Sequence, residues 1–153
     1  MKTLARKTDE AELLARLRTV RVDTARRWGR MSAHQMICHL ADAFRMALGQ
    51  KTASPASGVL QRTIVKAIAL YAPLPWPAGR IPTRPELDQE AEGTRPVEFA
   101  DDLAQVEVLL GLVSASSSTL AMRPHPTFGP LSEAAWLRWA YLHTDHHLRQ
   151  FGA

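Results

Sequence analysis

Apolar residues recur every three or four positions along much of the chain, which is the spacing of one face of an α-helix. A polar run before a leucine stripe predicts a first helix over residues 9–20. Ser32 and Gln35 form a capping box that opens a second helix, which extends to Leu48. Gly49 follows as the expected stop, because glycine adopts the left-handed conformation that ends many helices.

The same spacing predicts three further helices. A rather apolar helix spans residues 58–71, a fourth spans about residues 97–113, and a last helix, capped by Ser132, spans residues 133–151. No stretch shows the strict alternation of a β-strand. We therefore expect an all-α fold, an antiparallel four-helix bundle with one shorter helix, in a single domain over residues 1–153.

A long proline-rich loop separates the middle helices. Six of the ten prolines lie within residues 73–96, and connections of this length are uncommon inside a compact domain. Trp76, Ile81 and Leu87 give the segment apolar side chains to bury. We expect it to pack as an ordered cover across the bundle, anchored by Trp76, since proline lowers the entropy cost of ordering a loop.

The composition is that of an ordinary globular protein, with 46% hydrophobic and 22% charged residues. The lone Cys38 excludes an intramolecular disulfide and favours a reducing, cytoplasmic location. The start of the chain lacks the apolar run of a signal peptide. Residues 63–72, the most apolar stretch, are too few to span a membrane and include Lys66.

A net charge of +4 is modest for a nucleic-acid-binding protein. Six arginines between residues 16 and 30 keep that function as a third reading, although their alternation with apolar residues is typical of a solvated helix face. The expected partner is a small molecule, without nucleic acid or membrane, and a homodimer is left open.

The last predicted helix carries the most informative residues of the chain. His143 and His147 are four residues apart, so both point to one face, which they share with Trp136 and Trp139. His146 points about 60° away from that face. Two imidazoles so placed could grip one divalent metal ion. A pair of hydrogen-bonded histidines near the helix end, where positive charge is stabilised, is the alternative.

A catalytic metal requires a third ligand, and His39 is the best candidate because it lies mid-helix at the edge of an apolar stripe. We expect His34 to face solvent and His125 to serve in a proline turn. Asp42, one turn beyond His39, could orient it, bind the metal or act as a general base, or it could be an exposed carboxylate without a role. Gln150 shares the face of His143 and could support the ligands from behind.

Two segments together resemble a known family. Residues 28–42 (WGRMSAHQMICHLAD) and residues 142–152 (LHTDHHLRQFG) resemble the DinB-like superfamily. More narrowly, the turn His125-Pro126-Thr127-Phe128-Gly129 resembles the HPxFG turn of an uncharacterised bacterial branch. The resemblance covers nearly the whole chain.

This resemblance implies a four-helix bundle that binds a divalent metal, often zinc or nickel, through one histidine of the second helix and two of the last. By that pattern His39, His143 and His147 are the ligands. Characterised members include thiol-dependent transferases and isomerases that use bacillithiol, mycothiol or glutathione. The resemblance thus implies a metalloenzyme of thiol-dependent S-transferase type, with a metal-dependent hydrolase and a noncatalytic metal- or small-ligand-binding protein as alternatives.

Overall fold

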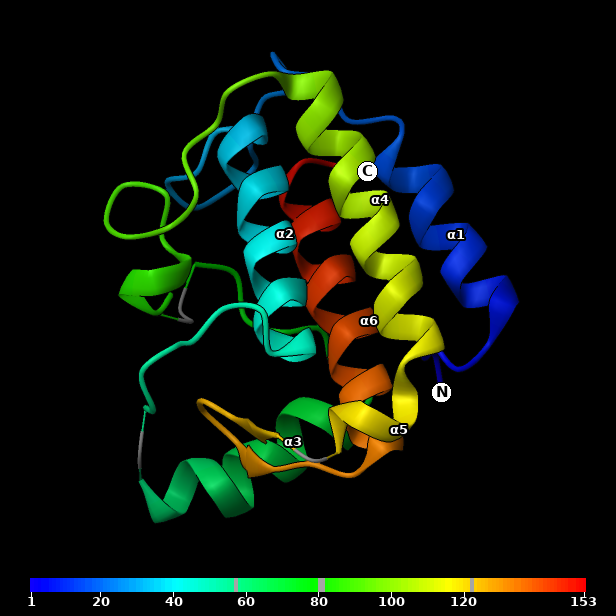
Figure 1. Cartoon of the computed structure of the whole chain (residues 1–153), viewed down its shortest axis with the longest axis vertical. Helices are drawn as coiled ribbons and strands as arrows, with labels where there is room; N and C mark the ends of the chain where they lie inside the picture. Colours follow the sequence, from blue (N-terminus) through cyan, green and yellow to red (C-terminus); the bar gives the residue numbers. More distant parts are fainter. Residues whose placement is uncertain (57, 80–81, 122) are drawn as a thin grey trace.

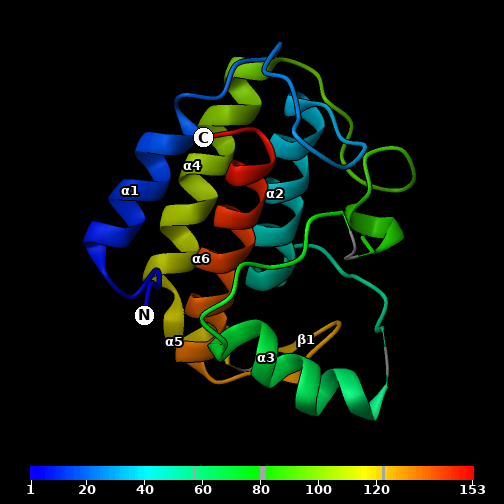
Figure 2. The ribbon, with the colours of Figure 1, turned by 180° about the vertical axis from the view of Figure 1, so that it is seen from behind.

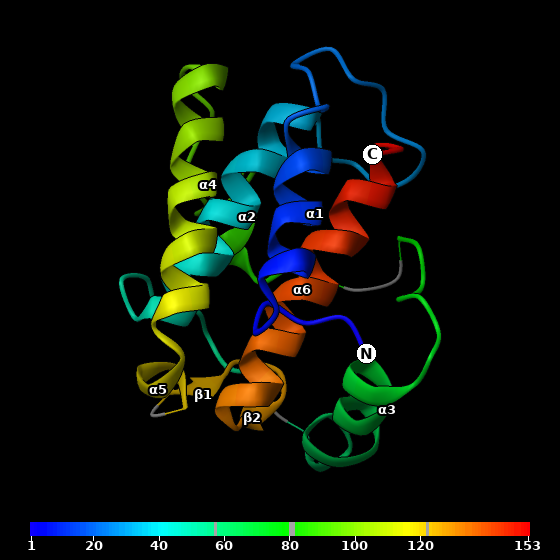
Figure 3. The same cartoon turned by 90° about the vertical axis from the view of Figure 1, so that its right-hand side faces the viewer.

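The computed structural model describes residues 1–56, 58–79, 82–121 and 123–153. Within these residues four long helices lie side by side, and Figures 1 and 3 show that two run in one direction and two in the other. They are α1 (Lys7–Leu17), α2 (Ala33–Leu48), α4 (Phe99–Ala115) and α6 (Glu133–Gln150). The helices α2 and α4 are parallel because the long segment between them returns the chain to the opposite end of the bundle. The predicted all-α bundle is confirmed.

The predicted helix ends are confirmed where a capping residue marks them. Ser32 Oγ accepts a hydrogen bond from the Gln35 amide, and the Gln35 side chain accepts one from the Ser32 amide, so the capping box of α2 is complete. Gly49 ends the helix at φ 77°, a conformation that other residues adopt at a cost. The first helix has no side-chain cap, and it begins at Lys7 and ends at Leu17, both earlier than predicted.

The region between α2 and α4 is less regular than its apolar pattern predicts. The expected third helix contains a π-helical turn, η1 (Gln61–Val65), before the short α3 (Lys66–Tyr71). A single 3₁₀ turn, η2 (Pro85–Leu87), follows in the proline-rich segment. A 3.6-residue pattern carries no signal for a widened turn.

The proline turn before α6 forms a small antiparallel ladder that the sequence did not predict. After the short helix α5 (Ser117–Leu120), strand β1 (Pro124–His125) pairs with β2 (Gly129–Pro130). Gly129 closes the turn at φ 66°. Two residues in each strand are too few to show alternation in a sequence, which explains the difference.

One hydrophobic cluster joins all four long helices. Leu13 of α1, Phe44 of α2, Leu110 of α4 and Trp136 of α6 are each at most 1% exposed. The packing of these side chains sets the relative orientation of α2 and α6. That orientation in turn positions the histidines described below. No helix in the described part of the chain is both long and apolar enough to cross a bilayer.

The described parts of residues 73–96 are attached to the bundle at several points, and Figure 2 shows this segment passing along α6. The Trp76 ring is partly buried against His143 and His146 of α6, at 6.1 and 5.9 Å between ring centroids. Its Nε1 donates to the Ala69 carbonyl of α3 at 2.7 Å. Leu87 is 7% exposed. Ile81, the other expected anchor, lies outside the described residues. The attachments of Trp76 and Leu87 agree with an ordered cover.

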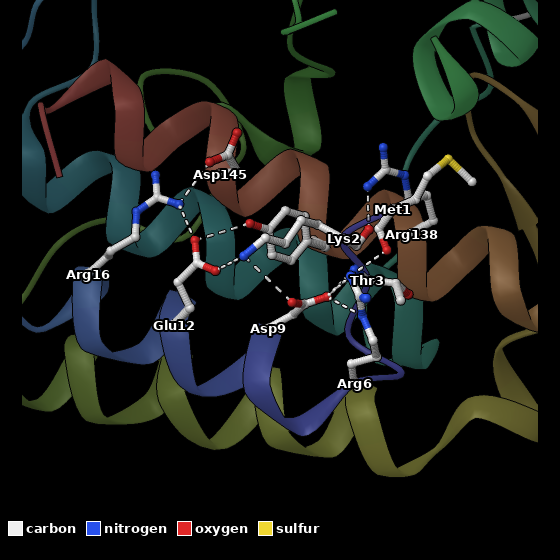
Figure 4. Close-up of polar contacts among 10 residues, drawn as sticks. Met1, Lys2, Thr3, Arg6, Asp9, Glu12, Arg16, Arg138 and Asp145 are labelled. Atoms are coloured by element: carbon white, nitrogen blue, oxygen red, sulfur yellow. Dashed lines mark hydrogen bonds and ion pairs between the residues drawn. The ribbon is translucent and has the colours of Figure 1, made fainter. Parts of the chain in front are cut away.

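Charged side chains tie the start of the chain to α1, and α1 to α6 (Figure 4). Asp9 is only 4% exposed, and its carboxylate accepts hydrogen bonds from the Thr3 amide and from Arg6. Burial alone would raise the pKa of Asp9, but these hydrogen bonds outweigh it and lower the pKa. Arg16 pairs with Asp145 at 2.8 Å, so at least this arginine of the predicted solvated face joins two helices.

His125 is a core residue as well as a turn residue. Its ring stacks on Phe128 and lies edge-on to Trp139, and it is 7% exposed. The amides of Thr127 and Phe128 donate to Nδ1, which places the ring proton on Nε2. Because burial disfavours the charged ring, the pKa of His125 is lowered to about 3.

We predict that His125 makes the metal-free protein acid-labile. Below a pH of about 6.5 the unfolded chain binds a proton at this histidine that the folded chain does not, so stability falls as pH falls. Between pH 7.5 and 5.5 the loss from this one group is about 1.4 kcal/mol. Urea unfolding at both pH values should show a loss smaller by that amount in His125→Asn, whose amide oxygen can still accept the turn N–H groups. An equal loss in both proteins would contradict the assignment.

Candidate metal centre

Three histidines converge where α2 meets α6. His39 comes from the middle of α2, and His143 and His147 come from successive turns of α6. Each offers a ring nitrogen, and the three nitrogens lie within 4.8 Å of one another. The Nε2 atoms of His39 and His143 are 3.2 Å apart. Two nitrogen ligands of one tetrahedral zinc ion lie about 3.3 Å apart, so this spacing fits a shared divalent ion.

Hydrogen bonds behind two of the rings fix which nitrogen is free. His39 Nδ1 lies 2.8 Å from the Leu87 carbonyl, and His147 Nδ1 lies 2.9 Å from Gln150 Oε1. Both partners are acceptors, so each Nδ1 carries the proton and each Nε2 keeps a lone pair. This tautomer is the one that a histidine needs to bind a metal through Nε2.

Gln150 is oriented by a backbone contact far along the chain. Its Nε2 donates to the Trp28 carbonyl at 2.9 Å, which turns its Oε1 toward His147. Gly29 provides the space for this amide, since a Cβ at that position would lie 2.5 Å from the Gln150 Nε2. The backbone of Gly29 also has φ 79°, which only glycine adopts readily. The dipeptide Trp28-Gly29 thus acts on the site indirectly, by holding the Gln150 amide that orients His147.

His143 is held differently from the other two. Its ring stacks on Trp139 with centroids 4.9 Å apart and an interplanar angle of 18°. Its Nδ1 is buried and has no hydrogen-bond partner among the described residues. Trp76 from the proline-rich segment covers the same ring, with centroids 6.1 Å apart. Aromatic packing therefore holds the side of this imidazole that lies away from His39, where the other two rings have a hydrogen bond at Nδ1.

The surroundings keep all three imidazoles neutral. Burial lowers the pKa of His39, and it lowers the pKa values of His143 and His147 well below the usual range. Neighbouring histidines lower the pKa values of His143 and His147 further, because charges so close together would repel. Neutral imidazole is the form that coordinates metal, so the ligands need lose no proton at neutral pH. The donor set fits a divalent transition-metal ion.

Asp42 is fully buried, so the alternative of an exposed carboxylate without a role is wrong. Its oxygens accept hydrogen bonds from Arg45, Lys51, Gln89 and both the amide and the hydroxyl of Thr94. Burial would raise the pKa of Asp42, but the hydrogen bonds from Lys51 and Thr94 outweigh it and lower the pKa. The carboxylate is thus ionised and bonded on both oxygens. Its role as a general base stays a prediction.

The Asp42 contacts connect to His39 through the backbone of the proline-rich segment. Gln89 and Thr94 bracket a tight turn that follows Leu87, whose carbonyl accepts from His39. Asp42 thereby attaches the end of the proline-rich segment to the same helix that carries His39. The sequence places Asp42 and His39 one turn apart, but nothing in it indicates that a backbone carbonyl 48 positions beyond His39 connects them.

A cavity of about 540 Å³ reaches one of the three histidines, His147. His147 and Gln150 form part of its wall, together with Trp28, Arg30 and His146. His146, expected about 60° from the ligand face, is not one of the three grouped histidines. Its ring lies against the Trp28 and Trp76 rings at 6.0 and 5.9 Å between centroids. Sequence reasoning missed Trp28 and His146 as cavity residues, because only the folded loops bring them to the last helix.

The other candidate histidines do not join the three. His125 lies in the core beyond Trp139, as described above. The expectation that His34 faces solvent is wrong, since its side chain is 14% exposed and its Nε2 lies 2.7 Å from Asp102 Oδ2. The cause is a tertiary contact, because α4 packs along α2 and brings Asp102 next to the first turn of α2. Cys38 is buried.

Comparison with curated proteins and with solved structures gives no match. One family model matches, over residues 3–153, and its description is a protein of unknown function, DUF1569. The match includes His39, His143, His147 and the residues that orient them. The chain therefore belongs to the DUF1569 family.

Proposed function

We propose that the protein is a metalloenzyme in which His39, His143 and His147 hold one divalent ion, zinc or nickel, and that it acts with a low-molecular-weight thiol on a small-molecule substrate. The observation that carries the metal assignment is the orientation of His39 and His147. Two independent acceptors, the Leu87 carbonyl and Gln150, leave their Nε2 lone pairs free beside His143. If the three histidines only formed hydrogen bonds with one another, His39 and His147 would not both need an acceptor that holds the proton on Nδ1.

The metal would supply Lewis-acid chemistry, making a coordinated thiol or water more acidic at neutral pH. Three imidazoles leave at least one coordination position for such a group. His147 is both a candidate ligand and part of the cavity wall, so the cavity lies next to the proposed metal site. The cavity volume of about 540 Å³ is in the range of small-molecule sites.

In this proposal the remaining site residues orient the histidine rings and limit the access of water. Gln150 and the Leu87 carbonyl keep the ring protons away from the metal side. The rings of Trp76 and Trp139 both pack against the His143 ring and limit access of water to it. Asp42, whose oxygens are already bonded, acts as a positioning residue through the turn at Gln89 and Thr94.

The thiol part of the proposal rests on the resemblance of residues 28–42 and 142–152 to the DinB-like superfamily. Zinc and nickel both accept soft thiolate ligands, so a thiol suits the open position. A metal-dependent hydrolase is the second candidate. It is favoured by His146, which lines the same cavity and whose pKa is lowered to about 4 by burial and by Arg149, so that it is a neutral proton acceptor at pH 7.

We predict that each of His39→Ala, His143→Ala and His147→Ala weakens binding of the divalent ion by more than roughly 100-fold, beyond the effect of an outer residue. Elemental analysis of protein purified without a metal-affinity tag, followed by zinc titration, measures this. His146→Ala is the matched control, since it removes an imidazole from the same helix outside the triad. Full metal retention in His39→Ala, or loss only in His146→Ala, would overturn the ligand set.

We predict that Gln150→Leu lowers zinc affinity by roughly 10- to 100-fold while the number of bound ions is unchanged. Leucine cannot accept the His147 Nδ1 proton, so the ring is no longer fixed in the metal-binding tautomer. Gln150→Glu keeps an acceptor and should retain most of the affinity. Equal affinities in the wild type and the leucine variant would show that this hydrogen bond does not orient the ligand.

The thiol assignment is tested by spectroscopy on cobalt-loaded Cys38→Ser protein, which has no thiol of its own. Added glutathione, or another low-molecular-weight thiol, should produce a thiolate-to-cobalt charge-transfer band in the near ultraviolet. The band should be absent when His143→Ala is also present. An unchanged spectrum with several thiols, on protein that still binds cobalt, would leave hydrolysis as the better proposal.

A further inference from the structure

A second group of ligand-type side chains lies on another side of α2. His34 and Cys38 are one helical turn apart near the start of α2, and Asp102 lies in the first turns of α4. Figure 1 shows these ends of the two helices side by side and running in the same direction. One ligand atom from each residue lies within 4.8 Å of the others. In the described part of the chain, only this cluster and the triad bring three such residues so close.

The contacts within the cluster converge on one oxygen. Asp102 Oδ2 lies 2.7 Å from His34 Nε2 and 3.6 Å from Cys38 Sγ, and it also accepts from the Val97 amide at 3.2 Å. The thiol is buried at the inner end of the cluster. The side chains of His34 and Asp102 are 14% and 18% exposed, so a small ion can reach the cluster from the surface.

Two kinds of chemistry use cysteine, histidine and aspartate together. A cysteine nucleophile needs a base in contact with its sulfur, but here Asp102 lies between the thiol and the imidazole. A metal site needs only that sulfur, nitrogen and oxygen meet at one point, which they do. Thiolate, imidazole and carboxylate are the three ligand types that zinc uses in proteins.

We propose that His34, Cys38 and Asp102 form a second site for a thiophilic divalent ion, zinc by chemistry, separate from the three-histidine centre. On binding, the sulfur–metal bond forms, the thiol proton leaves to solvent, and the His34 proton occupies Nδ1 so that Nε2 can coordinate. Asp102 exchanges its hydrogen bonds with the thiol and the imidazole for a bond to the ion. The Val97 amide can keep its hydrogen bond to the carboxylate throughout.

Such an ion would link α2 to α4 at the ends where residues 49–98, the longest connection in the chain, rejoin the bundle. The folded chain brings the three ligands together, and the unfolded chain separates Cys38 from Asp102 by 64 positions. An ion that binds mainly the folded state stabilises it. The site is thus a structural link, and it does not depend on the function proposed for the three histidines.

Cobalt titration without added thiols separates the two sites, because Cys38 is the only cysteine in the chain and the triad contains no sulfur. The wild type should bind two cobalt ions per chain and show a thiolate-to-cobalt charge-transfer band. His143→Ala should bind one ion and keep the band. Cys38→Ser should also bind one ion and lose the band. In His34→Ala and in Asp102→Asn, the cobalt concentration that gives half of the maximal band intensity should rise by roughly tenfold or more.

Thermal unfolding gives a second readout in case a substitution disturbs the fold. Zinc should raise the melting temperature of His143→Ala, and it should leave that of His143→Ala/Cys38→Ser unchanged. The proposal is overturned if folded His143→Ala shows no charge-transfer band at saturating cobalt. It is also overturned if the band titrates in His34→Ala and in Asp102→Asn at the same cobalt concentrations as in the wild type. Cobalt would then bind the Cys38 thiol without help from the other two residues.

Discussion

The cost of burying imidazole rings where α2 meets α6 governs the design of this protein. A desolvated ring nitrogen needs a partner, and His39 and His147 find theirs behind the site, in the Leu87 carbonyl and in Gln150. His143 is stacked on Trp139, and its Nδ1 has no partner among the described residues. The Nε2 atoms of His39 and His143 thereby face each other at 3.2 Å, a spacing that one shared cation would also satisfy.

Two of the backbone carbonyls that orient the candidate ligands, directly or through Gln150 of α6, come from the segments that connect the helices. Trp28 precedes α2, and Leu87 lies in the proline-rich segment before α4. Asp42 attaches that segment through Gln89 and Thr94, at the expense of burying a carboxylate whose charge is balanced by Lys51 and Arg45. The connections therefore do more than cover the bundle, since they determine the tautomer of two of the three rings.

The helix α2 presents different donors to its two neighbours. Toward α6 it offers His39 to a site made of nitrogen, and toward α4 it offers His34 and Cys38 to a cluster that includes sulfur and oxygen. Adjacent residues 38 and 39 serve different clusters because successive side chains on a helix point about 100° apart. The membership of the chain in the DUF1569 family makes both clusters testable features of a family whose function is not known.

The sequence by itself determined the features that depend on near neighbours. Ser32, Gln35, Gly49 and Ser132 mark helix ends through local hydrogen bonds, and the four-residue spacing of His143 and His147 places both on one face. His39 was singled out by its helix position and by resemblance to a family. Tertiary structure alone decided the partner of His34, the bonding of Asp42 and the role of the Leu87 carbonyl. Each of these depends on contacts between residues far apart in the chain or on a backbone group, and neither leaves a periodic signal in the order of side chains.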